Sequence, residues 1–306
     1  MPVAPEEVVG GLVFPECPRW RPDGLWFSDQ HAGHIQRVGT TGSAEVMVEV
    51  PGGPSGLGWL SDGSLMAVSM HDRKLLRIRF HGGGGPGATA RPEVTVAADL
   101  SHLHPGHSND MVVDRRGRCF IGNIGYDIHG GEPPRPTVLV LVEPASAPVT
   151  EAGEIGPMGE PRVVARDLVV PNGTVISEEG DRLIIAESMA HRLTSFRIAD
   201  DGQLVDRRVF ADLAGETPDG ICLDAEGAVW FASVGRREVV RVTDAGRVTD
   251  RVSTGPRRAI ACMLGGEDRR DLFICVTGSI DPVKALALRQ GAIEVCRVDV
   301  PGAGLP

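Results

Sequence analysis

TPDGICLDAEGAVWFAS, residues 217–233, is the stretch that decides the fold. Apolar residues alternate with polar or small residues on both sides of Glu226-Gly227. Because successive side chains of a strand face opposite sides of a sheet, alternation on either side of a short turn with glycine predicts a β-hairpin. Asp219 lies where the first strand of this predicted hairpin begins.

The same pattern occurs five more times along the chain. The copies are ECPRWRPDGLWFSD (16–29), SGLGWLSDGSLMAVS (55–69), NDMVVDRRGRCFIGN (109–123), NGTVISEEGDRLIIAES (172–188) and AIACMLGGEDRRDLFICVT (259–277). Further alternating segments between the copies bring each repeat to four strands. Six strand-and-turn repeats at spacings of roughly 40 to 60 residues are typical of a propeller. We therefore predict an all-β, six-bladed β-propeller over residues 1–306 as one domain, with segment 291–300 pairing with 8–14 to close the ring.

Composition excludes several classes of protein. The 41 acidic residues outnumber the 31 basic ones and give a net charge of −10, the wrong sign for binding a phosphate backbone, so no nucleic-acid partner is expected. The sequence shows neither a signal peptide nor an apolar run long enough to span a membrane, so we expect a cytoplasmic protein. The six cysteines are scattered singly through apolar segments, which predicts buried, reduced thiols.

The candidate functional residues lie seven residues before each hairpin turn. Five repeats place the following residues there: Glu16, Ser55, Asn109, Asn172 and Asp219. In the sixth copy the position falls near Ile260. Equivalent positions of propeller blades form a ring around the central axis, so four oxygen-bearing side chains are expected to converge at the mouth of the channel. Such a set suits a hard divalent cation.

A plainer interpretation of these residues is that they only form turns. Pro-Asn-Gly and Pro-Asp-Gly are ordinary turn sequences, and each residue taken singly needs no functional explanation. Their common register favours a site, because two carboxylates facing each other across a channel repel unless a cation lies between them.

These motifs resemble those of a known family. ECPRW (16–20), ND (109–110), VPNG (170–173) and TPDGICLDAEGAVWFAS occur in the order found in the SMP-30/gluconolactonase/LRE family, also called regucalcin-like. The resemblance implies a six-bladed propeller with one divalent metal, Ca²⁺, Mg²⁺, Mn²⁺ or Zn²⁺, at the channel mouth. It also implies hydrolysis of a sugar lactone or related ester, and hence a small-molecule partner.

Carried over by motif, the resemblance implies that Glu16, Asn172 and Asp219 bind the metal and that Asn109 contacts metal or substrate. The chain departs from the family pattern two residues before Asn109, where sugar-lactone members have an arginine and this chain has His107. Eighteen residues after Asn109, where those members have a glutamate, it has Asp127. The predicted substrate-binding residues are His107, Asn109, Asp110, Tyr126 and Asp127.

We predict metal-polarised attack of water on a lactone carbonyl, with Asp219 as the general base. Two other functions use the same residues: a non-hydrolytic lyase, isomerase or cyclase, and a Ca²⁺-binding propeller without catalysis. The sequence has no GxSxG nucleophile motif. A separate transition-metal site at His102, His104 and His107 is a further alternative, although their spacing fits no zinc motif. The sequence makes no prediction of oligomeric state.

Overall fold

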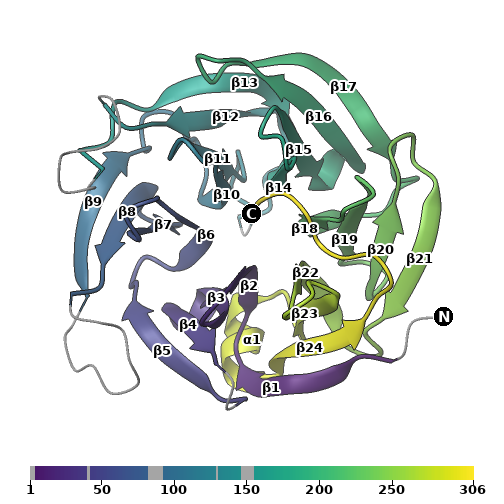
Figure 1. The fold of residues 1–306 in the computed structure, drawn as a ribbon. Coiled ribbons are helices and arrows are strands. Elements are labelled where there is room, and N and C mark those ends of the chain that lie inside the picture. Colours follow the sequence, from purple (N-terminus) through teal and green to yellow (C-terminus); the bar gives the residue numbers. More distant parts are fainter. Residues whose placement is uncertain (1–3, 40–41, 82–91, 129, 146–154) are drawn as a thin grey trace.

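The structure, a computed structural model, describes residues 4–39, 42–81, 92–128, 130–145 and 155–306. Six four-stranded antiparallel sheets surround a central channel as the blades of a propeller (Figure 1). The first strand of each hairpin copy lies nearest the channel and contacts the first strands of the neighbouring blades. The predicted six-bladed, all-β architecture is therefore confirmed.

The strands of the blades follow one another along the chain. Blade 1 contains β2 (Pro15–Arg21), β3 (Gly24–Asp29), β4 (His34–Val38) and β5 (Ala44–Glu49). Blade 2 contains β6 (Pro54–Trp59), β7 (Leu65–Ser69), β8 (Lys74–Arg79) and β9 (Glu93–Asp99). Blade 3 contains β10 (Ser108–Val113), β11 (Cys119–Asn123), β12 (Thr137–Val142) and β13 (Arg162–Leu168).

The second half of the ring repeats this order, except in its last blade. Blade 4 contains β14 (Pro171–Ile176), β15 (Arg182–Glu187), β16 (Arg192–Ile198) and β17 (Leu204–Asp212). Blade 5 contains β18 (Pro218–Leu223), β19 (Val229–Ser233), β20 (Glu238–Val242) and β21 (Val248–Ser253). Blade 6 contains β22 (Arg258–Gly265), β23 (Asp271–Thr277), β24 (Gly291–Arg297) and β1 (Glu6–Leu12).

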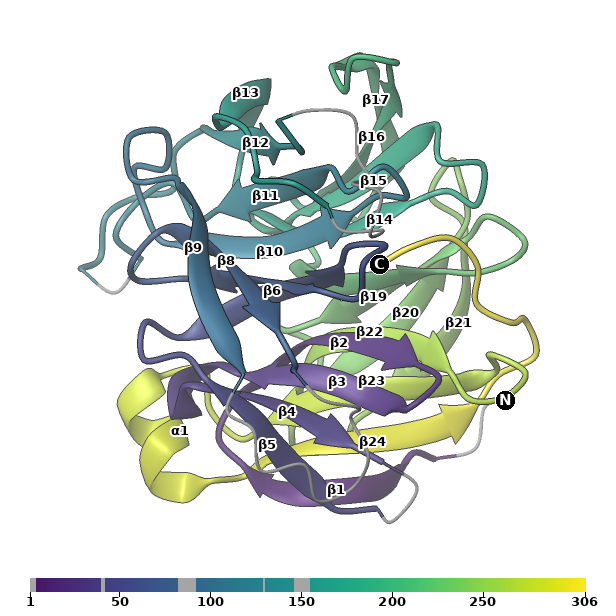
Figure 2. The same cartoon turned by 60° about the vertical axis from the view of Figure 1, so that its left-hand side comes forward.

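The ring closes by joining the two ends of the chain in one sheet. β1 pairs antiparallel with β24, with Glu6 opposite Val295 and Leu12 opposite Gly291, which confirms the predicted closure (Figure 2). An ion pair of 2.7 Å between Arg257 and Glu7 lies beside this seam. Hydrogen bonds between β1 and β24 thus fix the first and last parts of the propeller to each other.

The hydrophobic core lies between neighbouring blades rather than in one central mass. Blades 4 and 5, for example, share a cluster in which Val175, Ile184 and Phe210 pack with Ile221 and Phe231. Inner and middle strands such as β18 and β19 are buried on both faces, whereas the outer strand β17 exposes the run from Asp206 to Val209. All six cysteines are buried and free, as predicted.

The two ends of the channel differ. The C-terminal segment crosses the end at which the hairpin turns lie, with Leu305 bridged to Ile176 and Gly302 to Asp224. The inner strands begin at the other end, which we call the mouth. The only α-helix among the described residues, α1 (Pro282–Leu288), connects β23 to β24 on the mouth side, and Asp281 caps its N-terminus through the Lys284 amide.

Short 3-10 turns, η1 (Gln30–Ala32) and η2 (Ser188–Ala190), lie in the equivalent connections of blades 1 and 4. At seven residues α1 is too short to produce a periodic signal that sequence analysis can detect. No helix in the described part of the chain is long and apolar enough to cross a membrane.

The glycines of the Pro-Asn-Gly and Pro-Asp-Gly motifs allow the inner strands of neighbouring blades to pack closely. A Cβ on Gly173 would lie 2.5 Å from the Ile221 amide nitrogen, and one on Gly220 would lie 2.3 Å from the Ala261 Cβ. Neither glycine has the positive φ that a left-handed turn would require. These residues are therefore glycine because neighbouring inner strands approach too closely for a side chain.

We expect Gly220→Ala to lower the free energy of unfolding by about 1–3 kcal/mol, because the added methyl overlaps Ala261 in a packed wall. Gly235→Ala is the matched control, since a Cβ there meets nothing within 4 Å and the backbone φ is not left-handed. It should leave stability unchanged or raise it by up to about 1 kcal/mol. Urea unfolding of both variants measures the difference, and equal midpoints would contradict this account.

Candidate metal and substrate site

A bulge at the start of every inner strand positions the ring of polar residues. In β18, Pro218 pairs with Ser233 and Ile221 with Phe231, so the register shifts between them. The other five inner strands shift at the corresponding place. Because a bulge turns a side chain out of the regular alternation, the second residue of each inner strand can face the channel. These residues are Glu16, Ser55, Asn109, Asn172, Asp219 and Ala259.

The sixth position of the ring differs slightly from the prediction. The sequence placed it near Ile260, whereas strand pairing places Ala259 there, because Arg258 opposite Thr277 corresponds to Pro218 opposite Ser233. The sixth copy lacks the proline that marks the first position in four other blades, which is why its register was less certain. Blade 6 thus contributes a methyl group and no polar ligand.

The oxygens of the predicted metal ligands have few protein partners. Asp219 Oδ1 is buried and has no hydrogen-bond partner among the described residues. Glu16 Oε2 accepts a hydrogen bond of 2.9 Å from the Cys17 amide. Asn172 uses its Nδ2 to donate to Ser188 Oγ at 3.3 Å. A buried carboxylate oxygen without a donor is costly, so Asp219 Oδ1 is available to bind a cation or a proton.

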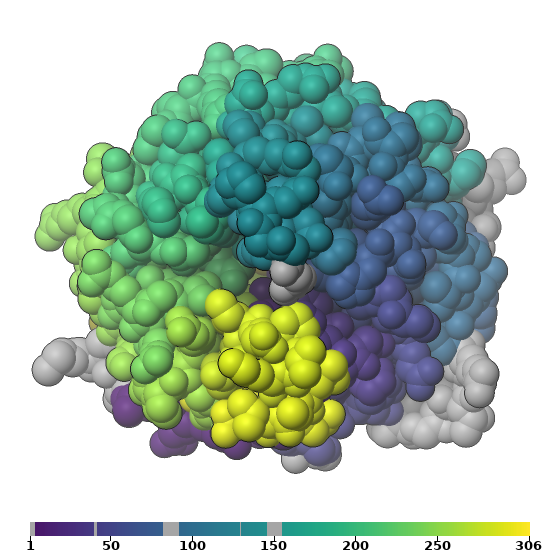
Figure 3. All heavy atoms as spheres, turned by 180° about the vertical axis from the view of Figure 1, so that it is seen from behind, coloured from purple at the N-terminus to yellow at the C-terminus, as the bar shows by residue number. Residues whose placement is uncertain are grey.

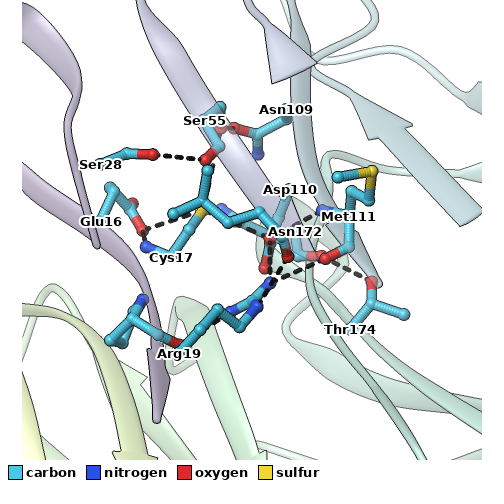
Figure 4. Close-up of polar contacts among 12 residues, drawn as sticks. Glu16, Cys17, Arg19, Ser28, Ser55, Asn109, Asp110, Met111, Asn172 and Thr174 are labelled. Carbon is cyan, nitrogen blue, oxygen red and sulfur yellow. Dashed lines mark hydrogen bonds and ion pairs between the residues drawn. The ribbon is translucent and has the colours of Figure 1, made fainter. Parts of the chain in front are cut away.

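Asn109 of blade 3 is separated from Asp219 of blade 5 by one blade, and its side chain is held by Ser55 of blade 2. Its Oδ1 accepts a hydrogen bond of 3.3 Å from Ser55 Oγ, and it is buried (Figure 4). Ser55, the ring residue of blade 2, therefore orients Asn109 rather than adding a separate ligand. The predicted contact of Asn109 with metal or substrate stays a prediction.

The carboxylates strongly influence one another. Burial raises the pKa of Glu16 well above its ordinary value, and the negative charges of Asp219 and Asp110 raise it further. Burial also raises the pKa of Asp219 to about 8, with Asp110 adding to the effect and a hydrogen bond from Asn172 opposing it. The three acidic residues therefore lie in one negative field at the mouth.

The donor set fits a hard divalent cation. Carboxylate and amide oxygens of Glu16, Asn172, Asp219 and Asn109 are the ligand types that such ions take in proteins, and water completes the shell. No group of three or more histidine, cysteine, aspartate or glutamate side chains suited to a metal occurs in the described part of the chain. Amide oxygens must consequently contribute to any site here.

Asp110 lies deeper in the wall than the ring residues. It is buried, and its Oδ1 accepts hydrogen bonds from Arg19 Nη2 at 3.0 Å and from the Met111 amide at 2.7 Å. These contacts, which sequence analysis did not anticipate, use Oδ1 within the protein. The predicted substrate contact of Asp110 stays a prediction.

The predicted substrate residues His107 and Tyr126 come from two packed segments. The His107 carbonyl accepts from the Ile124 amide at 2.9 Å, and a Cβ on Gly106 would lie 2.9 Å from the Tyr126 amide nitrogen. Tyr126 is buried, and burial raises the pKa of its hydroxyl, so it stays protonated. Asp127 is exposed and accepts from the Gly130 amide at 2.8 Å, which shapes its own turn.

His71 lies next to His107 and was not among the predicted site residues. Its Nδ1 lies 3.4 Å from His107 Nε2, and the two rings meet edge to face with centroids 4.5 Å apart. Backbone hydrogen bonds from Met70 and His71 to residues 53 and 52, and from Ser108 to Met70, fix this pair. Only the tertiary contact between blades 2 and 3 reveals it.

A cavity of about 350 Å³ adjoins His71 on the mouth side of blades 1 and 2. Its walls include Gln30, His31, His34, Glu49, His71 and Leu286 of α1. Figure 3 shows the mouth face, where α1 in yellow and the connection after β11 in teal lie next to the centre. Among the described residues that line this cavity, none belongs to the ring.

The three histidines of segment 102–107 do not converge on one point. His104 is buried, its Nδ1 lies 2.8 Å from Ser108 Oγ, and burial lowers its pKa to about 3, so it is neutral. His102 is exposed, and His107 faces His71. The alternative of a separate histidine metal site is not supported by this arrangement.

Comparison with known proteins identifies the family. Residues 14–278 match the family model described as SMP-30/Gluconolactonase/LRE-like region. The chain belongs to this family. The predicted family is thereby confirmed.

Relatives of this SMP-30/gluconolactonase-like chain include lactonases. It is 26% identical to 6-deoxy-6-sulfogluconolactonase of Pseudomonas putida over 303 residues, which cover 96% of this chain and 94% of the relative. It is 25% identical to pentonolactonase XacC of Haloferax volcanii over 304 residues, covering 95% and 92%. The solved structure of the calcium-binding protein regucalcin from Agrobacterium tumefaciens has the same fold, with a TM-score of 0.75, 20% identity and coverage of 100% and 97%.

Proposed function

We propose that this protein is a divalent-metal-dependent lactonase that opens a sugar lactone or a related cyclic ester. The observation that carries the proposal is the buried Asp219 Oδ1, which lacks a protein partner in a ring of carboxylate and amide oxygens. The names of the relatives, sulfogluconolactonase and pentonolactonase, support lactones as the substrate class. We further propose that residues 1–306 act as one cytoplasmic domain.

The metal site consists, in this proposal, of Glu16, Asn172 and Asp219, with Asn109 at its edge. These residues would hold a divalent cation, which would supply polarisation of a carbonyl oxygen and a lowered pKa of water. Glu16 and Asn172 hold their positions through Cys17 and Ser188. The metal itself is Ca²⁺, Mg²⁺, Mn²⁺ or Zn²⁺, because oxygen ligands discriminate weakly among these ions.

Asp219 acts as the general base. Its surroundings raise the affinity of its carboxylate for a proton, which suits proton transfer near neutral pH. The carboxylate takes a proton from the attacking water as the oxygen adds to the carbonyl carbon. The ring C–O bond then breaks, the alkoxide takes up a proton, and a hydroxy acid results.

His107, Tyr126 and Asp127 orient the substrate on the blade 3 side, together with Asn109 and Asp110. His107 offers an imidazole where sugar-lactone members of the family have an arginine. It is held by His71, and the cavity beside His71 offers room for groups attached to the lactone ring. An imidazole in place of a permanently charged guanidinium favours neutral, hydroxylated lactones over anionic ones.

A panel of five- and six-membered sugar lactones tests the proposal by pH-stat. Hydrolysis consumes one water and releases one proton per lactone opened, whereas an isomerase or cyclase releases none. We expect proton release with saturable kinetics above the spontaneous rate, and one ¹⁸O from labelled water in the product carboxylate. Metal binding with no turnover on the panel would instead support a non-catalytic Ca²⁺-binding propeller.

A further inference from the structure

Arg19 is a buried cation that connects three blades next to the candidate metal site. It lies on β2 of blade 1 and is 4% exposed. Its Nε donates to the Leu57 carbonyl of blade 2 at 2.9 Å. Its Nη2 donates to Asp110 Oδ1 at 3.0 Å and to the Met111 carbonyl at 2.7 Å, both in blade 3 (Figure 4). Neither the fold of a single blade nor the proposed reaction requires this residue.

Asp110, the partner of Arg19, is the third residue of its inner strand. Three other blades have glycine, which has no side chain, at this position. The third residue of the inner strand is Gly56 in blade 2, Gly173 in blade 4 and Gly220 in blade 5. A Cβ on any of these would lie 2.5 Å or less from an atom of the next inner strand. Blade 3 therefore places the Asp110 carboxylate, immediately after Asn109, where the inner strands of the other blades pack closely.

The Arg19–Asp110 pair is connected to Glu16 of the ring through the thiol of Cys17. Cys17 Sγ lies 3.3 Å from Asp110 Oδ1 and 3.9 Å from Glu16 Oε2. Glu16 consequently lies one side chain away from Asp110, and Arg19 Nη2 contacts the same Asp110 oxygen, Oδ1, as Cys17 Sγ does. Charges this close and this buried interact far more strongly than charges on the surface.

The formal charges of four side chains then match a divalent ion. With all three carboxylates ionised, Glu16, Asp110 and Asp219 contribute −3 and Arg19 contributes +1, so these four side chains sum to −2. We propose that Arg19 sets the charge of the site to −2 and thereby selects divalent over trivalent cations. Arg19 acts as a positioning residue, because its two hydrogen bonds into blade 3 also hold Asp110 Oδ1 away from the ion. This inference rests on the proposed divalent site.

Calorimetric titration with CaCl₂ and with LaCl₃ tests the inference on the full chain. In Arg19→Met the site carries −3, and a trivalent ion gains more from the extra charge than a divalent one does. We expect the ratio of La³⁺ to Ca²⁺ affinity to rise by about 10- to 100-fold. Arg19→Lys, which keeps the charge, should keep the ratio within a few-fold of the unmodified protein.

Two further variants keep the test decisive if Arg19→Met folds poorly. Asp110→Asn changes the summed formal charge to −1. It should lower the ratio of La³⁺ to Ca²⁺ affinity by about 10- to 100-fold. The double variant Arg19→Met/Asp110→Asn restores −2 without an unpaired charge, and its ratio should return to the original value. Such a cycle isolates the effect of charge from loss of the ion pair itself.

Arg77→Met is the matched control. Arg77 forms an ion pair with Asp62 in blade 2, and both side chains are 7% exposed, similar to the 5% and 7% of the Arg19–Asp110 pair. Loss of the Arg77–Asp62 ion pair should lower the stability of the protein without changing the ratio of La³⁺ to Ca²⁺ affinity. An unchanged ratio in both Arg19→Met and Asp110→Asn, with Ca²⁺ still bound, would overturn the role of Arg19. Absence of Ca²⁺ binding to the unmodified protein would instead overturn the proposed metal site.

Discussion

Replacing Asp219 with asparagine is expected to lower kcat/KM for lactone hydrolysis by about 10²- to 10⁴-fold, the contribution of a well-placed general base. Asparagine keeps an oxygen for the metal and the approximate size of the side chain, but it cannot accept the proton of the attacking water. The variant should therefore bind metal while losing turnover. Initial rates in the pH-stat, corrected for spontaneous opening, together with calorimetric metal titration, measure the two properties separately.

The matched control for this substitution is Asp23→Asn. Asp23 occupies the hairpin turn of blade 1, pairs with Arg37 at 3.0 Å and is 49% exposed in its side chain. Its loss should leave kcat/KM within about twofold, because exposed ion pairs contribute little to stability. Full activity of Asp219→Asn with metal bound would remove Asp219 from the role of base and leave it as a ligand alone.

Removal of the divalent cation is expected to lower lactone hydrolysis by at least about 10²-fold, since electrostatic stabilisation of the developing oxyanion is lost. Stability should fall as well, because an ion that binds only the folded protein at 100 times its Kd contributes about 2.7 kcal/mol. The physical cause is mutual repulsion of Glu16, Asp110 and Asp219, which a cation offsets.

The measurement combines chelation with re-addition of single metals. Activity and urea midpoint are recorded after treatment with EDTA, and again after addition of Ca²⁺, Mg²⁺, Mn²⁺ or Zn²⁺. Glu16→Gln serves as the control, because it removes one ligand and one of the repelling charges, so its midpoint should respond less to chelator. A chelated protein that retains both activity and stability would exclude a metal-dependent mechanism.

The sequence predicted the inner ring well because the hairpin repeat is local. The alternation in Thr217–Ser233 and its copies encodes strand, turn and strand within about 15 residues, and the register of Glu16, Asn109, Asn172 and Asp219 follows from counting. The closing strand was also predictable, since an unpaired alternating segment remained at each end of the chain. Even so, the sixth copy was placed one residue off, because bulges shift register without a sequence signal of their own.

The sequence by itself determined that this chain forms six four-stranded blades and, for five of them, which residue is second in the inner strand, because alternation and turn chemistry act between neighbours in the chain. Only the tertiary structure decided what those residues meet. Arg19 reaches Asp110 across 91 positions, and His71 reaches His107 from the adjacent blade. Such contacts depend on how the blades pack around the axis. The alternation of residues within a single hairpin does not predict them. The polar contacts around the channel mouth therefore come from the closed ring.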